Sequence, residues 1–316
     1  MRTLLFVLLF GLMSACARVE ASRQPVHVDM RNVDLHVSPE VTVHVRHLRG
    51  EFAPINRQAP HLDDVQSYSV AVDSGEIAVD LVSLNALLDR SLAGERSNIE
   101  HLRVGIADGG MLQQKGVIDR AINIPFSAKS AVSLTPDGRI RVTTKSVKAF
   151  GVPIRPFMKI FSLEMDDLVK VKPGQGVTVA DNDMIIDPSR LLPSPAFRGR
   201  LTAVRIENNS LVQVFGSAPS RSLASRRLAD NHIYWRGGQL SFGKLTMTDT
   251  DLELVDLDPG DAFSFSVNDW NAQLVAGYSK TLTNRALRAH MPDYEDLKGN
   301  HRMAHRTANH DAGRTR

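Results

Sequence analysis

The sequence predicts an α+β protein in which a long, curved antiparallel sheet wraps around one or two amphipathic helices. Through most of the 316 residues, apolar and polar side chains alternate with a period of two, as half-buried strands do. Two stretches instead repeat apolar residues at steps of three and four, which is typical of one face of a helix. The expected strands come in consecutive runs, so antiparallel meanders are favoured over parallel βαβ units.

Residues 1–17 have the pattern of a targeting segment. Arg2 supplies a positive charge, and residues 3–13 form an apolar run that is too short to span a bilayer. Met13-Ser14-Ala15-Cys16 then resembles a bacterial lipobox, in which Cys16 becomes the acylated first residue of the mature protein. Ordinary cleavage after Ala17 and an uncleaved anchor are the alternatives. We therefore expect an exported, periplasmic lipoprotein held at a membrane by acyl chains such as palmitate on Cys16.

The N-terminal part of the mature chain is expected to be mostly strand. Alternating runs lie at residues 26–30, 33–37 and 41–45, with breaks at Asn32 and at Ser38-Pro39. Residues 53–66 are polar and contain two prolines, which indicates a loop. The turn sequence Asp73-Ser74-Gly75 predicts a hairpin between residues 68–72 and 76–80.

Two amphipathic helices are expected. In the first, the stripe comprises Leu84, Leu87, Leu88 and Leu92, with Ser83 as the cap and Gly94 as the stop. The second runs from Ile154 to Val169, with Pro156 in its first turn, where a missing N–H costs little. Its apolar face comprises Ile154, Met158, Phe161, Met165 and Leu168.

Strands are expected around and after these helices, and they divide the chain into regions. The runs lie at residues 102–106, 111–117, 122–134, 140–147, 177–179, 184–186, 201–206 and 211–215. Residues 22–216 would form the main domain, and residues 217–230 a Ser/Arg-rich linker. Residues 231–297 would form a β-rich extension with strands at 233–235, 240–242, 245–247 and 252–255, followed by a disordered basic tail at 298–316.

A series of short motifs between Ser67 and Gly216 resembles the LmeA-like phospholipid-binding proteins of the tubular lipid-binding (TULIP) superfamily. The motifs are Leu84-Asn85-Ala86-Leu87-Leu88, Ile106-Ala107-Asp108-Gly109-Gly110, Asp137-Gly138-Arg139-Ile140, Gly151-Val152-Pro153-Ile154, Gly176-Val177, Leu191-Leu192-Pro193, Gly199-Arg200-Leu201-Thr202 and Val214-Phe215-Gly216. The resemblance implies a curved antiparallel sheet rolled around a long helix, with an apolar groove for acyl chains.

The expected function is non-enzymatic binding of phospholipid or another acyl lipid beside a membrane surface. The expected contacts lie on the two helices: Leu84, Leu88, Ile154, Phe157, Met158, Phe161, Met165 and Leu168. Such residues more often form a plain core than a lipid site, so core packing is the alternative interpretation. Arg221, Arg226 and Arg227, together with the basic tail, are candidates for anionic headgroups. The net charge of +3 does not favour nucleic acid as a partner.

Other chemistry finds little support in the sequence. A Gly-x-Ser-x-Gly elbow, a P-loop and a dinucleotide fingerprint are all missing, so we expect neither an enzyme nor a cofactor. The histidines His27, His36, His44 and His47 lie on expected strands, where His44 and His47 would point to opposite faces. The aspartates Asp249, Asp251, Asp256, Asp258 and Asp261 do not have the spacing of a calcium loop. We therefore expect no metal site.

Two alternative functions remain open. The protein could be a structural β-scaffold of the cell envelope that binds other proteins through its sheet edges or its Gly237-Gly238 region. It could also be a hydrolase of envelope lipids or glycans, because a catalytic triad is a spatial arrangement that a sequence does not display.

Overall fold

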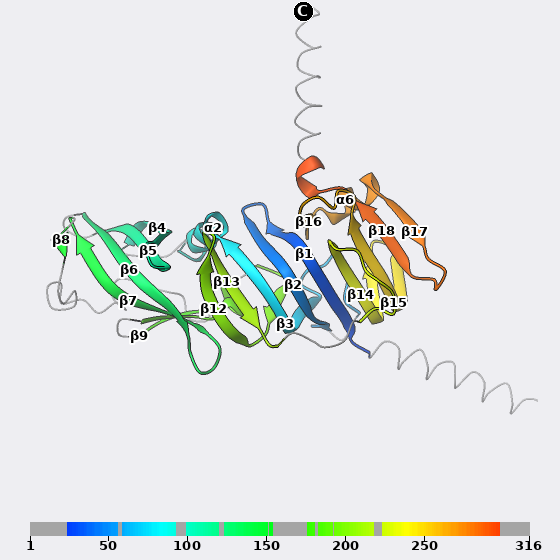
Figure 1. Cartoon of the computed structure of the whole chain (residues 1–316), viewed down its shortest axis with the longest axis horizontal. Helices are drawn as coiled ribbons and strands as arrows, with labels where there is room; N and C mark the ends of the chain where they lie inside the picture. The colour runs from blue at the N-terminus through cyan, green and yellow to red at the C-terminus, as the bar shows by residue number, and fades with distance from the viewer. Residues whose placement is uncertain are drawn as a thin grey trace, which may run out of the picture. The chain divides into compact units, whose positions relative to one another are not determined.

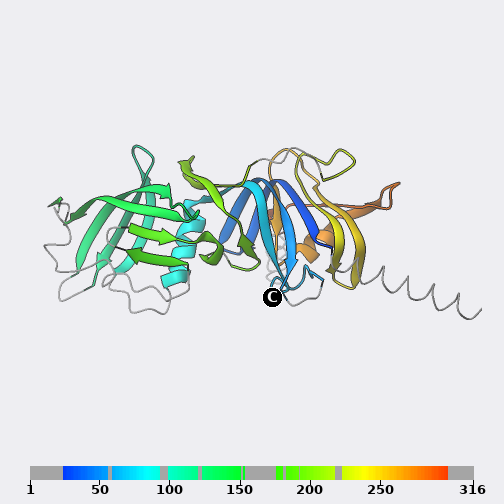
Figure 2. The same cartoon turned by 90° about the horizontal axis from the view of Figure 1, so that it is seen from below.

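The computed structural model describes residues 24–55, 59–92, 99–119, 123–150, 152–153, 176–180, 183–191, 193–217 and 223–297. The chain divides into two compact units. Unit 1 comprises Met1–Leu35, His47–Ala71 and Pro219–Arg316, and unit 2 comprises His36–Arg46 and Val72–Ala218. Both units consist mainly of strands in curled, largely antiparallel sheets (Figures 1 and 2).

Three long strands contribute residues to both units. They are β1 (Val26–Ser38), β2 (Val41–Pro54) and β3 (Tyr68–Asp80), and they pair in the order β3-β2-β1. The break predicted at Asn32 is wrong, because β1 continues through this residue. Asn32 takes a φ of 50°, which asparagine tolerates better than most residues. Its amide donates to Asn231 Oδ1 at 2.8 Å and to the Asp261 carbonyl at 3.2 Å.

The hairpin predicted at Asp73-Ser74-Gly75 is also wrong, since β3 is one continuous strand. Gly75 lies opposite Phe215 of β13 (Ser210–Phe215), and Ser74 is buried. The neighbouring chain passes so close that a Cβ on Gly216 would lie 1.9 Å from the Asp73 carbonyl oxygen. The small residues Ser74 and Gly75 therefore allow close packing here and do not form a turn.

In unit 2, the helix predicted around Leu84 is confirmed as α2 (Leu81–Leu92). Its cap differs from the prediction: Asp80 Oδ1 accepts the Ser83 N–H at 2.7 Å, and Ser83 Oγ accepts the Thr42 N–H at 2.9 Å. The Asn85 amide pairs with both backbone groups of Val104, at 2.8 and 2.9 Å, as a neighbouring strand would. This pairing fixes α2 against β4.

One sheet of unit 2 has the order β4-β5-β6-β7-β10-β9, with β8 beside β7. Its strands are β4 (Ile99–Ala107), β5 (Met111–Ile118), β6 (Ile124–Leu134), β7 (Ile140–Ala149), β8 (Val152–Pro153), β9 (Val177–Ala180) and β10 (Asp183–Ile186). The register places Ile118 opposite Ile124, and Ile140 opposite Ile186, so one face is apolar. The predicted strands of this region are confirmed.

The remaining elements of unit 2 are α5 (Pro188–Leu191), β11 (Ala196–Arg198), β12 (Leu201–Glu207) and β13. Of these, β11 and β13 pair with β3, β12 pairs with β13, and α5 contacts β11. The predicted hairpin between β12 and β13 is confirmed, with Asn208 and Asn209 both at positive φ in its turn.

Unit 1 continues from β1 in the order β14-β15-β18-β17, and β16 pairs with β1. Its elements are β14 (His232–Phe242), β15 (Leu245–Asp256), β16 (Phe263–Ser266), α6 (Trp270–Ala276), β17 (Tyr278–Thr281) and β18 (Leu287–Met291). The four short strands predicted between residues 233 and 255 are two long ones. Strands β15 and β18 run parallel, whereas the pairs β1–β14, β14–β15 and β17–β18 are antiparallel. Since β14 pairs with β1, the C-terminal part shares its sheet with residues 26–38.

Several predictions lie outside the described residues. These are the targeting segment 1–17 with Cys16, the helix Ile154–Val169 and the tail 298–316. Within the described ranges, no helix combines the length and the apolar character needed to cross a membrane.

Candidate functional site

The described part of unit 1 contains an apolar cavity of about 350 Å³. Its volume falls within the range typical of small-molecule pockets, which are mostly apolar with a few polar groups. One wall comes from strands β14, β15, β17 and β18, through Phe242, Leu245, Leu252, Leu254, Tyr278, Ser279, Leu287 and Ala289. Trp270 and Leu274 of α6, with Gly277 and Leu62, complete it.

The helix α6 is held over this cavity by a buried amide. Gln273 is fully buried, and its Nε2 donates to the carbonyls of Ser264 and Pro292 at 2.8 and 2.9 Å. Its Oε1 accepts the Ser266 N–H at 2.9 Å. The helix is thereby tied both to β16 and to the segment after β18. Trp270 packs edge-on against Phe242, with ring centroids 5.9 Å apart.

The loop that contains Leu62 closes another side of the cavity. Leu62 donates its N–H to the Ser241 carbonyl at 2.8 Å, which extends the pairing at the end of β14. Asp63 accepts from Asn271 Nδ2 at 2.7 Å and from the Gly243 N–H at 2.5 Å. These bonds lower the pKa of Asp63 despite the opposing effect of burial. The loop is thus fixed to α6 and to the β14–β15 turn.

The exposure of the lining residues distinguishes an inner end from a mouth. Leu252, Leu254 and Ala289 are between 1% and 4% exposed, so they form the inner end. Leu245 is 48% exposed and Tyr278 is 46% exposed, so they mark the mouth. Apart from the Ser279 hydroxyl and the polar tips of Trp270 and Tyr278, the lining is hydrocarbon or glycine. The cavity therefore suits an apolar ligand.

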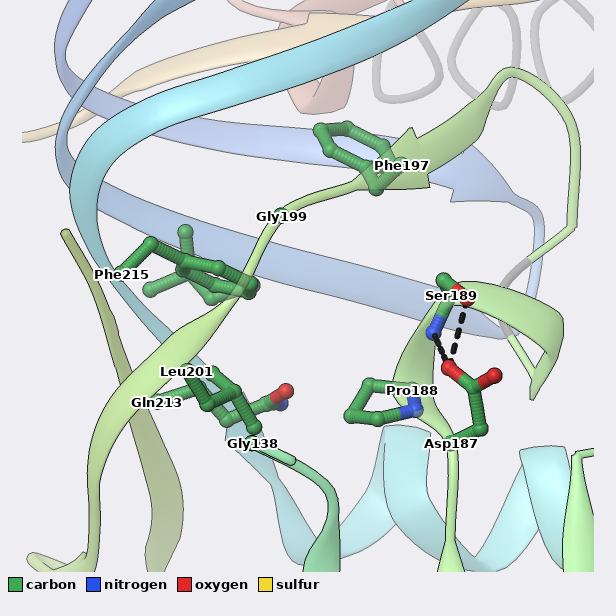
Figure 3. Close-up of a pocket in the computed structure, with 10 residues that line it drawn as sticks. Gly138, Asp187, Pro188, Ser189, Phe197, Gly199, Leu201, Gln213 and Phe215 are labelled. Atoms are coloured by element: carbon green, nitrogen blue, oxygen red, sulfur yellow. Dashed lines mark hydrogen bonds between the residues drawn. The ribbon is translucent and has the colours of Figure 1, made fainter. Parts of the chain in front are cut away.

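The described pocket of unit 2 is much smaller, with a volume of about 30 Å³ (Figure 3). Phe197 and Phe215 occupy one side, and Asp187 holds Ser189 through its N–H at 3.1 Å and its hydroxyl at 2.5 Å. Gln213 is 4% exposed, and its Oε1 has no hydrogen-bond partner among the described residues. The space has room for about one water molecule and none for an acyl chain.

The residues predicted to contact lipid are placed only in part. Leu84 and Leu88 are half-buried on α2, and neither lines either of these two cavities. The predicted contacts on the second helix lie outside the described residues: Ile154, Phe157, Met158, Phe161, Met165 and Leu168. Apart from Leu62, the residues that line the described cavity instead lie in the region 231–297 that was predicted to be an extension.

A buried ion-pair network lies on strand β15 of unit 1. Glu253 is fully buried and accepts Arg226 Nη2 at 3.1 Å and Arg288 Nη2 at 2.8 Å. Asp251 accepts Arg226 Nη1 at 2.7 Å and also pairs with Arg236. Arg226 was a candidate for lipid headgroups, but these two carboxylates occupy its guanidinium. Arg227 is exposed, and Arg221 lies outside the described residues.

Three carboxylates meet at the end of β15. Oxygens of Asp256, Asp261 and Asp293 lie within 4.8 Å of one another. Burial raises the pKa of Asp293 to about 7, and the charges of Asp256 and Asp261 add to the rise. Backbone N–H groups account for the geometry, because Asp256 accepts from Asp258 at 2.8 Å and Asp293 accepts from Ser264 at 2.8 Å. Asp293 was missed by the sequence reasoning.

Two of the histidines predicted on strands, His27 and His36, have separate partners. His27 lies 3.4 Å from Glu51, and His36 Nδ1 lies 3.0 Å from Thr42 Oγ1. Among the described residues, the three carboxylates above form the one group close enough to hold a metal, so these histidines do not assemble such a site. The buried His232 contacts the Ala229 carbonyl at 2.6 Å and lies 3.4 Å from Asp29.

No protein-family model, curated protein or solved structure matches this chain. A proposal for the function therefore rests on the cavity, the geometry of the sheets and the sequence.

Proposed function

We propose that this protein is an exported, non-enzymatic lipid-binding protein of the cell envelope, anchored through an acylated Cys16. The observation that carries the proposal is the apolar cavity of about 350 Å³ in unit 1. It is lined mainly by aliphatic and aromatic side chains, which range from the exposed Leu245 and Tyr278 to the buried Leu252 and Ala289.

Binding would be driven by removal of an acyl chain from water. Each methylene that enters the cavity contributes about 0.8 kcal/mol, so about ten methylenes contribute on the order of 8 kcal/mol. Loss of translational and rotational freedom offsets part of this gain. Reversible binding of a membrane-derived lipid is the expected result, and no covalent chemistry is needed.

The curled antiparallel sheets and the amphipathic helix α2 are also consistent with the TULIP-like architecture that the sequence resembles. In that architecture the groove would lie in the region now assigned to unit 2. We place the lipid in unit 1 instead, because the described pocket of unit 2 measures only about 30 Å³.

Native mass spectrometry of the purified protein, followed by lipid extraction, tests the proposal. We expect one co-purified acyl lipid per chain. In the variant Leu274→Trp, an indole would enter the cavity and the lipid should be lost. Val275→Trp is the matched control, because Val275 lies on the same helix, does not line the cavity and is 85% exposed. A bare mass that persists after incubation with liposomes would rule the proposal out.

A protein-binding scaffold is the second candidate, and one observation favours it. Strand β17 ends its sheet, and all four of its residues are exposed, so its backbone can pair with another chain. The Gly237-Gly238 region is a weaker candidate, because a Cβ on Gly238 would lie 2.5 Å from the Gln24 carbonyl oxygen. If the protein is such a scaffold, we expect it to carry no lipid. We also expect Ser279→Pro to abolish its association with a partner protein.

A further inference from the structure

We infer that the unit 1 cavity takes a single unbranched acyl chain of about fourteen carbons, and therefore selects one-chain over two-chain lipids. This inference rests on the proposed function and names the class of ligand. It follows from the volume of the cavity, its polarity and the position of its mouth.

The volume sets the capacity. An engineered apolar cavity of about 150 Å³ holds benzene, which has six carbons. By proportion, the 350 Å³ of this cavity holds about fourteen carbons. One acyl chain of ordinary length fills that space, whereas the second chain of a diacyl lipid would have to remain outside it, in water.

The polarity sets the orientation. No charged side chain is among the residues that line the cavity. An ionised headgroup buried there would lose its hydration without gaining a partner, which costs several kcal/mol or more. The headgroup therefore stays at the mouth, beside Leu245 and Tyr278, and the chain enters with its methyl end first. The Ser279 hydroxyl lies on the exposed strand β17, where it can hydrogen-bond the polar end of the ligand.

A chain-length series tests the capacity. The full-length protein would be titrated with saturated fatty acids of eight to eighteen carbons, and binding followed by native mass spectrometry. The dissociation constant should fall by about fourfold for each added methylene while the chain still enters the cavity. Beyond about fourteen carbons, further methylenes remain in water and the affinity should stay constant.

A cavity-filling variant tests whether this cavity measures the chain. Ala289→Leu adds three carbons to the inner end, so the plateau should begin at chains about three carbons shorter. Ala276→Leu is the matched control, because it adds the same three carbons to an exposed position on α6 that does not line the cavity. The series in the unmodified protein remains decisive if Ala289→Leu fails to fold.

The outcomes separate this inference from the proposed function. Two results together support the single-chain site. The affinity should reach its plateau near fourteen carbons, at a chain length that Ala289→Leu shortens and Ala276→Leu does not, and dimyristoyl phosphatidylcholine should bind weakly. Affinity that keeps rising through eighteen carbons, or equally tight binding of the diacyl lipid, would overturn it and leave lipid binding intact. Failure to bind every acyl ligand would overturn both.

Discussion

The cavity described in unit 1 and the pocket described in unit 2 are both lined largely by apolar residues, but their volumes differ about tenfold. In unit 2, the phenyl rings of Phe197 and Phe215 fill the pocket to about 30 Å³. In unit 1, the strand wall carries the small residues Ser279 and Ala289, and about 350 Å³ remains. The difference shows that an apolar lining alone does not determine how much space remains between the walls of a pocket. What decides it is whether the side chains from opposite walls meet.

Both units also fix a helix with one side-chain amide. Gln273 in unit 1 and Asn85 in unit 2 each make three hydrogen bonds to backbone groups. Gln273 is fully buried, whereas Asn85 is half-buried. Only the first of these helices covers the cavity, so loss of the two anchors should affect function differently.

The buried charges of unit 1 should give the largest difference between the units. Glu253→Gln leaves Arg226 and Arg288 without their buried partner, which should cost about 3 kcal/mol of unfolding free energy. Glu76 in unit 2 also binds two arginines, Arg46 and Arg205, but its side chain is 19% exposed. Glu76→Gln should cost about 1 kcal/mol. Urea denaturation of both variants measures the difference, and equal losses would contradict the role assigned to burial.

Removal of the two amide anchors should give a difference of similar size. Gln273→Ala leaves one N–H and two carbonyls unpaired in a buried place, which should cost about 3 kcal/mol. It should also weaken acyl-chain binding, because α6 would no longer be held over the cavity. Asn85→Ala should cost about 1 kcal/mol, since water can reach these groups, and should leave lipid binding unchanged. Thermal denaturation and fatty-acid titration of both variants provide the measurement. Reduced binding in Asn85→Ala alone would place the lipid site in unit 2 instead.

Added volume should be tolerated only where space exists. A Cβ on Gly199 in unit 2 would lie 2.8 Å from Phe215 Cδ1 and 3.0 Å from Val72 Cβ. Gly199→Ala should therefore cost about 2 kcal/mol through overpacking. Ala289→Leu in unit 1 adds more atoms but should cost less than about 1 kcal/mol, because the cavity accepts them. A larger loss for Ala289→Leu, measured by urea denaturation, would show that the cavity is not an open space in solution.

The sequence predicted the strands of unit 2 well, because their alternation and their turns are local properties. Asn208-Asn209 predicts the β12–β13 hairpin, and both residues have the positive φ that this turn requires. Asp73-Ser74-Gly75 has an equally strong turn pattern but lies within β3. There the close approach of Gly216 outweighs local turn preference, and a single sequence holds no record of that contact.

The candidate site was missed for a related reason. Helix α6 has only seven residues, too few for a clear three- and four-residue repeat. Asp269 before it and Gly277 after it were the available signals, since aspartate and glycine often flank helices. The cavity itself depends on the empty volume beside Ala289, which no local pattern reports. The predicted contacts on the helix Ile154–Val169 remain predictions.

The smallest effect that we predict is a pH dependence of opposite sign in the two units. Asp293 in unit 1 has a pKa raised to about 7 from its ordinary 3.8, chiefly by burial. Between these two values the folded protein keeps a proton that the unfolded chain releases. The contribution of Asp293 to the free energy of unfolding therefore falls as pH rises from about 4 to 7. The decrease is on the order of 1 kcal/mol after solvent screening.

Asp293→Asn should therefore match the unmodified protein near pH 4 and be more stable at pH 8. Asp137 in unit 2 is the counterpart, because hydrogen bonding from Thr135 and the charge of Arg139 lower its pKa. Asp137→Asn should be less stable than the unmodified protein at pH 8, and the difference should disappear as pH falls below the ordinary pKa of aspartate. Urea denaturation in EDTA measures both differences, at pH 4 and pH 8 for Asp293→Asn and at pH 8 and below about pH 3 for Asp137→Asn. If Asp293→Asn were destabilising at pH 8, the charged carboxylate would be a stabilising group, and the crowding of Asp256, Asp261 and Asp293 would not be repulsive in the folded protein.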